Sequence, residues 1–475
     1  MYTIFNSDLD QYARETVSRH LSFEHGEWSG QSLALYQETQ VRHTLRHVLA
    51  GSPFYAAHLG PYVEDAGSTT LAGLRGLPFT TKDDLRNHGT DILSRPVSDA
   101  WIFYETTGTT GKATPCPRDN TDSTATNTAL TINYASVLRA HPGPHVVGIM
   151  GPTELHSTGD AFGEVFRNLG QCVAKIWPHS PVVGYRRALE VMHDLGISAL
   201  VCTPGMAMSL AREARLAGFS PRDDFRLSFI MVVGELVTPA LLDNIRAIWS
   251  AEVYNCMYAS QEASILAAIR DDGRLRTIPL NNYYEVIDPD TGTEAIPGSD
   301  GAQEGELVVT HLFQGCKPLV RYRTGDMVRL APLPESAEYP SAVLTPLGRV
   351  RDLTTIGGRA FSAYELEQAV LENTTACCGY QIVIDNPTGG RDELRVILEY
   401  LGAGAAGSLD AGAVRAGVAR RLGISPDVEV GEIGTIATTG ALVSWKASRV
   451  HDKRAGDDAE RRAAVAIAAR RDQAR

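Results

Sequence analysis

Between residues 146 and 233, short apolar runs alternate with longer stretches in which apolar residues recur at helical spacing. Three of the runs are rich in β-branched or other apolar residues and cover 146–150, 199–202 and 229–233, while 185–195 is one of the helical stretches. Strands that are separated by helices return to the same edge of a sheet through crossovers, and they therefore pair in parallel. The pattern predicts a parallel sheet with crossover helices, and hence an α/β fold.

The rest of the chain has a different texture on each side of this region. The beginning is mainly helical over 9–49, and Gly51-Ser52-Pro53 interrupts that pattern before a second helical stretch at 54–59. After Tyr283, strand and turn signals dominate, and beyond residue 350 strand and helix signals mix again. We expect a large N-terminal domain, residues 1–350, of packed sheets and helices with a β-rich subdomain, and a small C-terminal α/β domain, residues 351–475.

Charge and composition exclude several classes of partner. The 475 residues carry a formal net charge of −12, which gives no basic footprint for nucleic acid. The N-terminal residues lack a basic segment followed by an apolar one, and no apolar run approaches the roughly 18 residues that a membrane helix needs. Seven scattered cysteines fit reduced thiols better than a disulfide framework. We therefore expect a cytoplasmic protein that binds neither nucleic acid nor membrane.

A loop rich in threonine and glycine follows a predicted strand at 101–104. It consists of Thr106, Thr107, Gly108, Thr109, Thr110, Gly111 and Lys112. Glycines let the backbone approach phosphate oxygens, hydroxyls and amides donate hydrogen bonds, and the lysine adds positive charge. Only two residues separate the glycines, whereas the common nucleotide-binding P-loop has four. Alone, the loop indicates either phosphate binding or a flexible turn.

Further segments, read in order, carry a resemblance to a known family. They are 77–86 (LPFTTKDDLR), Cys202-Thr203-Pro204, Gly234-Glu235, Tyr258-Ala259-Ser260-Gln261-Glu262, 321–326 (RYRTGD), Gly348-Arg349 with Asp352, and Lys446-Ala447-Ser448-Arg449-Val450. With the Thr/Gly loop, these segments resemble the adenylate-forming superfamily, specifically its phenylacetate-CoA ligase branch. The resemblance extends over residues 40–454.

The resemblance implies that ATP activates a carboxylic acid as an acyl-adenylate, with release of pyrophosphate and then transfer to a thiol. Lys446 would be the main catalytic residue, at the bond between the acid and the α-phosphate. The loop from Thr106 to Lys112 would hold the β- and γ-phosphates, with Lys112 as a second catalytic residue. Glu262 would help to hold Mg²⁺.

The family pattern also implies where the rest of ATP and the acid bind. Tyr258 and the backbone of Gly234 and Glu235 would frame the adenine, and Gln261 would contact the α-phosphate. Asp326 and Arg349 would bind the ribose. The segment 155–163 resembles the loop that lines the pocket for aromatic or arylacetic acids. The residues that we expect to contact the acid are His156, Ser157, Asp160, Ala259 and Ser260.

The family also has a small domain that rotates between its two reaction steps, which implies a hinge at 349–352. By the same analogy the chain would form a homodimer.

Several positions depart from the family pattern, mostly on the side of the acceptor. Ala259 replaces a usual glycine, Gln261 a hydroxyl residue, and Trp445 the glycine directly before the lysine. Arg351 and Tyr364 are also unusual at their positions. The sequence leaves the acceptor open between CoA, a carrier-protein thiol and a nitrogen nucleophile. It also leaves open a relative that binds nucleotide or acid without catalysis.

Overall fold

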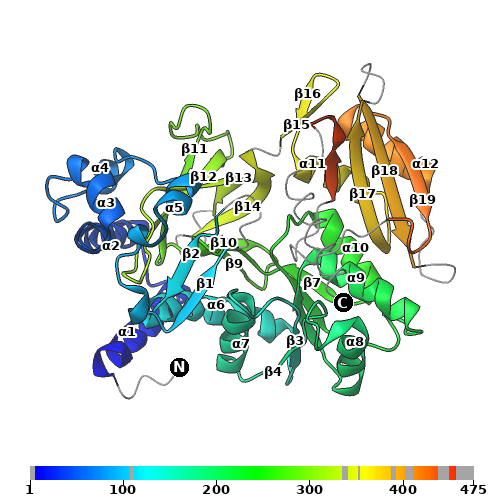
Figure 1. Ribbon diagram of the computed structural model, residues 1–475, viewed down its shortest axis with the longest axis horizontal. Coiled ribbons are helices and arrows are strands. Elements are labelled where there is room, and N and C mark those ends of the chain that lie inside the picture. The colour runs from blue at the N-terminus through cyan, green and yellow to red at the C-terminus, as the bar shows by residue number, and fades with distance from the viewer. Residues whose placement is uncertain are drawn as a thin grey trace. The chain divides into compact units, whose positions relative to one another are not determined.

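The computed structural model describes residues 6–106, 112–333, 341–350, 353–386, 392–401, 410–436 and 449–455 (Figure 1). These residues form two compact units, and the chain passes between the units several times. The first unit contains 1–142, 153–169 and 257–346, and the second contains 143–152, 170–256 and 347–475. Neither unit is therefore one continuous piece of chain.

An antiparallel-rich sheet of seven strands forms the centre of the first unit, in the order β11-β12-β13-β14-β10-β9-β8. A separate hairpin pairs β1 with β2. The strands of this unit are β1 (Ile102–Glu105), β2 (Pro115–Arg118), β8 (Met257–Ser260), β9 (Ser264–Ile269), β10 (Leu275–Thr277), β11 (Asn282–Ile287), β12 (Gln303–His311), β13 (Tyr322–Pro332) and β14 (Ala342–Arg349), whose last residues already belong to the second unit. The predicted β-rich character after Tyr283 is confirmed by β11, β12 and β13.

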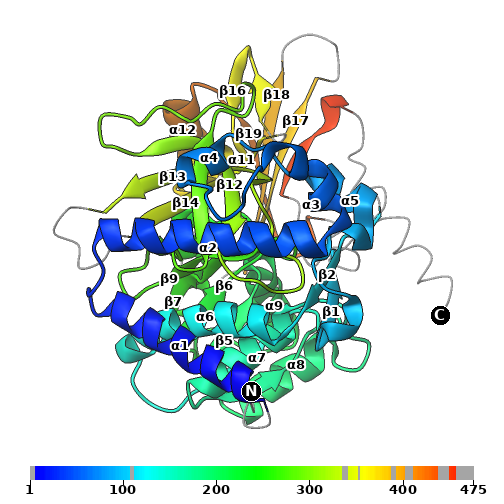
Figure 2. The same ribbon diagram turned by 90° about the vertical axis from the view of Figure 1, so that its left-hand side faces the viewer.

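Helices of the first unit pack on this sheet and on one another. α1 packs on α6, α6 packs on α7 and β9, and α2 packs on β12; Figure 2 shows α1 and α2 in blue. The helices are α1 (Ser7–Glu24), α2 (Gly30–Gly51), α3 (Pro53–His58), α4 (Leu71–Arg75), α5 (Lys82–His88), α6 (Asn120–Ala140) and α7 (Thr158–Asn168), with short 3-10 helices at η1 (Gly60–Tyr62), η2 (Gly89–Ile92) and η3 (Val97–Asp99). The long helical stretch expected at 9–49 is divided, because Gly26 turns the chain with φ 73° and Ser29 caps α2 through a reciprocal pair of hydrogen bonds with Ser32.

The second unit contains the parallel sheet that the sequence predicts. Its order is β4-β3-β5-β6-β7, and all neighbouring strands are parallel. The elements are β3 (Val146–Ile149), β4 (Cys172–Lys175), α8 (Gly184–Asp194), β5 (Ala199–Cys202), α9 (Pro204–Leu216), β6 (Phe229–Val232), α10 (Pro239–Trp249) and β7 (Glu252–Asn255). The predicted runs at 146–150, 199–202 and 229–233 are confirmed as β3, β5 and β6. Strands β5 and β6 are buried along their whole length, which explains their unbroken apolar sequence.

The C-terminal residues add a second sheet to this unit, in the order β19-β18-β17-β20. The elements are β15 (Thr354–Ile356), β16 (Arg359–Phe361), α11 (Ala363–Leu371), β17 (Cys377–Asp385), β18 (Glu393–Tyr400), α12 (Ala411–Leu422), β19 (Asp427–Gly431), β20 (Val450–Asp452) and η5 (Lys453–Ala455). One apolar core joins buried side chains of β5 and β6 to those of β17 and β18. α10 packs on α11, and both α9 and α10 pack on β17. The separate C-terminal domain at 351–475 and its mobility stay predictions.

In the described part of the chain, no helix is both long enough and apolar enough to cross a membrane.

Candidate active site

The Thr/Gly loop lies in the sequence between β1 and β2, the two strands of a hairpin. β1 and β2 are antiparallel, with Glu105 opposite Pro115. Beyond that pair, Thr106 N donates to Thr114 O over 3.1 Å, and Thr114 N donates to Thr106 Oγ1 over 2.9 Å. Thr107, Gly108, Thr109, Thr110 and Gly111 lie outside the described residues, and Lys112 beyond them is exposed. Thr106, the first residue of the predicted phosphate loop, is therefore held to Thr114, two residues after the loop ends.

The predicted acid-binding segment lies against this hairpin. Glu105 N donates to Leu155 O over 3.1 Å, and Leu155 has a positive φ of 53°, which is uncommon for a branched side chain. Tyr104 Oη donates to Asp160 Oδ2 over 3.2 Å. Burial, and then the charge of Asp160, raises the pKa of Tyr104, so its hydroxyl stays protonated and can donate. The segment is thus tied to β1 through both backbone and side chain.

Gln261 connects the acid-binding segment to the turn after β8. Ser157 Oγ donates to Gln261 Oε1 over 2.5 Å, and Gln261 Nε2 lies 3.5 Å from Glu105 O. Arg118 on β2 donates to the carbonyl of Gln261 over 3.3 Å. The structure therefore brings together Ser157, Gln261 and the hairpin, which are far apart in sequence. His156, also expected to contact the acid, accepts from the backbone of Thr158 over 3.3 Å.

Tyr258 and Asp326 meet across the sheet. Tyr258 Oη donates to Asp326 Oδ2 over 2.7 Å. Burial, and then the charge of Asp326, raises the pKa of Tyr258 well above its ordinary value. The register between β8 and β9 shifts between Tyr258 and Ala259, and Ser260 Oγ accepts from Ala263 N over 3.0 Å. An irregularity of this kind re-aims the side chains of a strand that approaches a site.

Glu262, the predicted magnesium ligand, is 7% exposed. Lys82 Nζ lies 3.1 Å from Glu262 Oε1, but this oxygen accepts no directed hydrogen bond from a described residue. Burial alone would raise the pKa of Glu262; Lys82 and then Lys317 more than offset burial, so the pKa is lowered. A buried carboxylate that stays ionised and retains acceptor capacity is a suitable ligand for a hard cation.

Lys82 is a site residue that the sequence did not identify as one. It begins α5, where Thr81 and Asp84 form a reciprocal cap. The preceding residue Thr80 is held by backbone hydrogen bonds, since Thr80 N donates to Arg321 O over 3.0 Å and Arg323 N donates to Thr80 O over 2.9 Å. The backbones of segments 77–86 and 321–326 therefore pair with each other at Thr80. The only signal in the sequence was their joint presence in the family pattern.

Lys317 is a second cation that the sequence did not mark. It is 6% exposed, and its Nζ donates to Pro115 O over 3.0 Å and lies 3.1 Å from Cys116 Sγ. Both acceptors belong to β2, the strand that follows the Thr/Gly loop. Lys317 thus braces the hairpin while its charge acts on Glu262.

The remaining predicted residues lie in the second unit or outside the described residues. Gly234 has a φ of 88°, which favours glycine, and the side chain of Glu235 pairs with Arg449 and accepts from Gly205 N over 3.1 Å. The prediction that the backbone of these two residues frames adenine stays a prediction. Arg349 is the last residue of β14. Lys446, Trp445, Arg351 and Asp352 lie outside the described residues, and so does the centre of the expected hinge.

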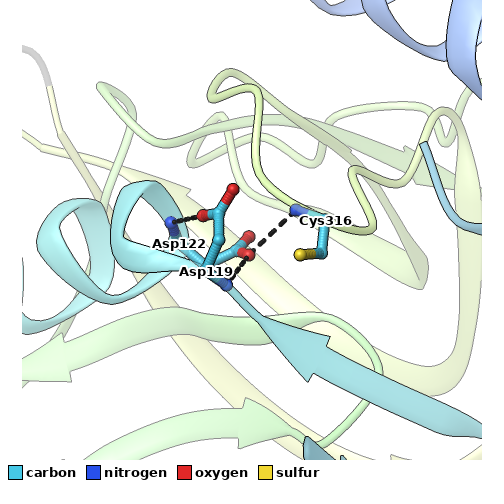
Figure 3. Close-up of side chains that lie close together, drawn as sticks. All are labelled: Asp119, Asp122 and Cys316. Carbon is cyan, nitrogen blue, oxygen red and sulfur yellow. Dashed lines mark hydrogen bonds between the residues drawn. The ribbon is translucent and has the colours of Figure 1, made fainter. Parts of the chain in front are cut away.

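Asp119, Asp122 and Cys316 lie close enough together to suggest a metal site (Figure 3). Their contacts instead describe a helix cap at the start of α6. Asp119 Oδ1 accepts from Asp122 N over 2.9 Å, and Asp122 Oδ2 accepts from Asp119 N and Cys316 N. Arg95 pairs with Asp119 over 3.2 Å, and a Cβ at Gly315 would lie 1.8 Å from Asp122. Burial, and then Asp119, raises the pKa of Asp122 to about 7. Dense packing and local hydrogen bonds account for the cluster without an ion.

Comparison with known proteins places these residues in context. No family model matches the chain. The chain is 28% identical over 441 residues to the phenylacetate-coenzyme A ligase of Pseudomonas putida, covering 89% of this chain and 94% of that protein. It is 27% identical over 383 residues to the phenylacetate-coenzyme A ligase of Thermus thermophilus, covering 78% and 82% respectively. A solved structure of 2-hydroxyisobutyryl-CoA ligase in the postadenylation state matches with a TM-score of 0.74 over 90% of both chains, at 21% identity, which shows a shared fold.

Proposed function

We propose that this chain activates an aromatic or arylacetic acid and transfers it to the thiol of CoA. The chain is an AMP-forming acid ligase of the adenylate-forming superfamily, distantly related to phenylacetate-CoA ligases. In the first step a carboxylate oxygen of the acid attacks the α-phosphorus of ATP, and pyrophosphate leaves. In the second step the thiolate attacks the acyl carbonyl, and AMP leaves. Both steps depend on positioning and on neutralising the charge that moves onto the leaving group.

The observation that carries the proposal is the convergence of separate segments on the turn that follows β8. The hairpin of β1 and β2 reaches this turn through Glu105, the acid-binding segment through Ser157, and α5 through Lys82. β13 reaches the same region through Asp326, which accepts from Tyr258. Adenylation requires groups for the phosphates, the acid and the ribose, and we assign these roles to the segments that meet at this turn.

Asp326 and Glu262 have distinct roles in this proposal. Tyr258 fixes the orientation of the Asp326 carboxylate, which accepts hydrogen bonds and therefore suits ribose hydroxyls. Glu262 Oε1 is a buried anionic oxygen without a directed donor among the described residues, so it fits Mg²⁺. When bound, the ion would neutralise charge on the phosphates of ATP. Glu262 would hold it after exchanging the ammonium of Lys82.

The acid would bind near Ser157 and Asp160. Ser157 is held by Gln261, and Asp160 accepts from Tyr104, so both polar groups have fixed directions. A polar group with a fixed direction discriminates between acids that can and cannot hydrogen-bond to it. We therefore infer that an aromatic acid with a hydroxyl or amino substituent is preferred over the unsubstituted acid.

A mass-spectrometric assay with ATP, Mg²⁺ and a panel of aryl acids tests the proposal. We expect AMP and pyrophosphate with aryl acids, and a thioester when CoA is supplied. Preference for a long aliphatic acid would contradict the substrate class. Products with amines and none with CoA would assign the chain to amide formation, and nucleotide binding without pyrophosphate release would indicate a non-catalytic relative.

The Lys446→Ala variant tests the catalytic assignment in the same assay. Because its charge is needed where the acid joins the α-phosphate, acid-dependent pyrophosphate release should nearly disappear. Transfer from a supplied acyl-adenylate should remain largely intact. Release at the wild-type rate would refute the role of Lys446.

A further inference from the structure

Arg449 is buried among partners from three different segments of the second unit. Its guanidinium pairs with Glu235, donates to Tyr380 Oη over 2.6 Å, and lies 3.5 Å from Glu367 Oε2. Tyr380 in turn donates to Glu367, which also accepts from Thr238 Oγ1 over 3.1 Å. We call Arg449, Glu235, Glu367, Tyr380 and Thr238 the Arg449 network.

Hydrogen bonds also hold the backbone at Arg449. Ile382 N donates to Arg449 O over 2.8 Å, and the next residue begins β20, which pairs with β17 in parallel. Arg449 is only 8% exposed. Burial alone would lower the pKa of Arg449, but Tyr380, Glu235 and Glu367 raise it, so the side chain is a permanent cation. Backbone and side chain together define the position of this residue.

The Arg449 network joins the end of the parallel sheet to the C-terminal elements of the second unit. Glu235 and Thr238 follow β6 of the parallel sheet, and Glu235 also accepts from Gly205 N at the start of α9. Glu367 and Tyr380 belong to α11 and β17. The arginine therefore fixes the start of β20 to the carboxyl end of the parallel sheet.

Arg449 stands three residues after Lys446 in the sequence, and three residues of chain reach at most about 11 Å. The position of Arg449 therefore limits how far from it the lysine can lie. We propose that Arg449 is a positioning residue for adenylation: its network sets where the segment that carries Lys446 enters β20. This inference rests on the proposed function, in which Lys446 serves the first step and not the second.

The test compares the two half-reactions in one set of variants. In Arg449→Met, pyrophosphate release should fall about 100-fold, the loss expected when a reacting group is displaced by about 1 Å. Formation of the thioester from a supplied acyl-adenylate and CoA should stay within about threefold of wild type. Arg449→Lys keeps the charge but loses the planar fork, so it should recover only part of the lost rate.

Arg212→Met is the matched control. Arg212 on α9 lies 3.6 Å from the buried carboxylate of Glu399 on β18, so this variant also breaks an ion pair between the same two parts of the second unit. A merely structural loss should lower both half-reactions equally in Arg212→Met. Glu367→Gln opens the Arg449 network with a smaller change, and it should show the selective loss even where Arg449→Met does not fold.

An equal loss of both half-reactions in Arg449→Met and Glu367→Gln would overturn the inference, and so would the same selectivity in Arg212→Met. Either result leaves the proposed function standing, provided that wild type forms AMP from an acid. Wild type that forms no AMP from any acid would instead remove the proposed function and this inference with it.

Discussion

Two carboxylates, Glu262 in the first unit and Glu235 in the second, pair with cations that differ in their exposure to solvent. Glu262 is buried, but its partner Lys82 has a side chain that is 46% exposed and makes no directed hydrogen bond to it. Glu235 and Arg449 are both buried, with side chains 3% and 8% exposed, and both have further partners. A half-exposed lysine is easily exchanged for another cation, whereas an enclosed arginine is not. We therefore expect the cation at Glu262 to exchange and the cation at Glu235 to stay in place.

The largest effect should come from breaking the enclosed pair. Arg449→Met leaves Glu235 and Glu367 buried without their cation, which typically costs about 3 to 5 kcal/mol of unfolding free energy. Urea unfolding followed by tryptophan fluorescence measures this change, with the exposed Arg395→Met, whose partner Glu429 is also exposed, as the control. Similar losses in both variants would mean that burial does not distinguish the pairs.

The next effect concerns Glu262 as a ligand. Glu262→Gln removes the anionic oxygen but keeps the size of the side chain, so we expect pyrophosphate release to fall by about 100-fold with little loss of stability. Titrating Mg²⁺ in the release assay should show a weaker dependence on the ion. Glu304→Gln provides a control, because Glu304 is 59% exposed and pairs with Arg329 over 3.4 Å. An unchanged Mg²⁺ dependence in Glu262→Gln would remove the metal assignment.

The smallest effect is expected for Lys82→Met, and it depends on pH. The folded state lowers the pKa of Glu262 from its ordinary 4.5, so the ionised carboxylate contributes stability above about pH 4.5, which is lost as the pH falls through the folded value. Removing Lys82 takes away part of that contribution. Because Lys82 is half-exposed and screened by solvent, we expect a loss of about 1 kcal/mol or less at pH 7.

Urea unfolding of wild type and Lys82→Met at pH 7 and at successively lower pH measures this difference. The gap between the two proteins should narrow as the pH falls below 4.5. A gap that widens on acidification would contradict the ion pair.

The parallel sheet was predictable from sequence for a local reason. Strands β5 and β6 are buried along their whole length, so each appears as an uninterrupted apolar run. The β-rich region could also be predicted, because turn residues such as Asp288 and Gly292 separate its strands. In the structure, Gly292 N donates to Asp288 O over 2.9 Å. The division of the N-terminal helical stretch was not predicted, since the decisive signal is a single left-handed glycine, Gly26.

The side-chain pairs within the candidate site could not be predicted from the sequence, because they join residues that are far apart along the chain. Family resemblance supplied Tyr258, Glu262 and Asp326 as separate positions, and the structure adds which side chain faces which. Lys82 and Glu262 are far apart in the chain, and nothing in their local sequences specifies that they meet. The partners of Arg449 come from β17, α11 and the loop after β6, so the Arg449 network depends on the complete tertiary fold.

The discontinuous second unit also bears on how the protein is made. The ribosome completes α9 and α10 long before it reaches β17 and α11, the elements on which their apolar faces pack. During that interval those faces are not yet covered by β17 and α11. Exposed apolar surface of this kind favours aggregation and chaperone binding. A fragment that stops at residue 346 would carry the same uncovered helices permanently. The last quarter of the chain therefore supplies the elements that cover these faces of α9 and α10.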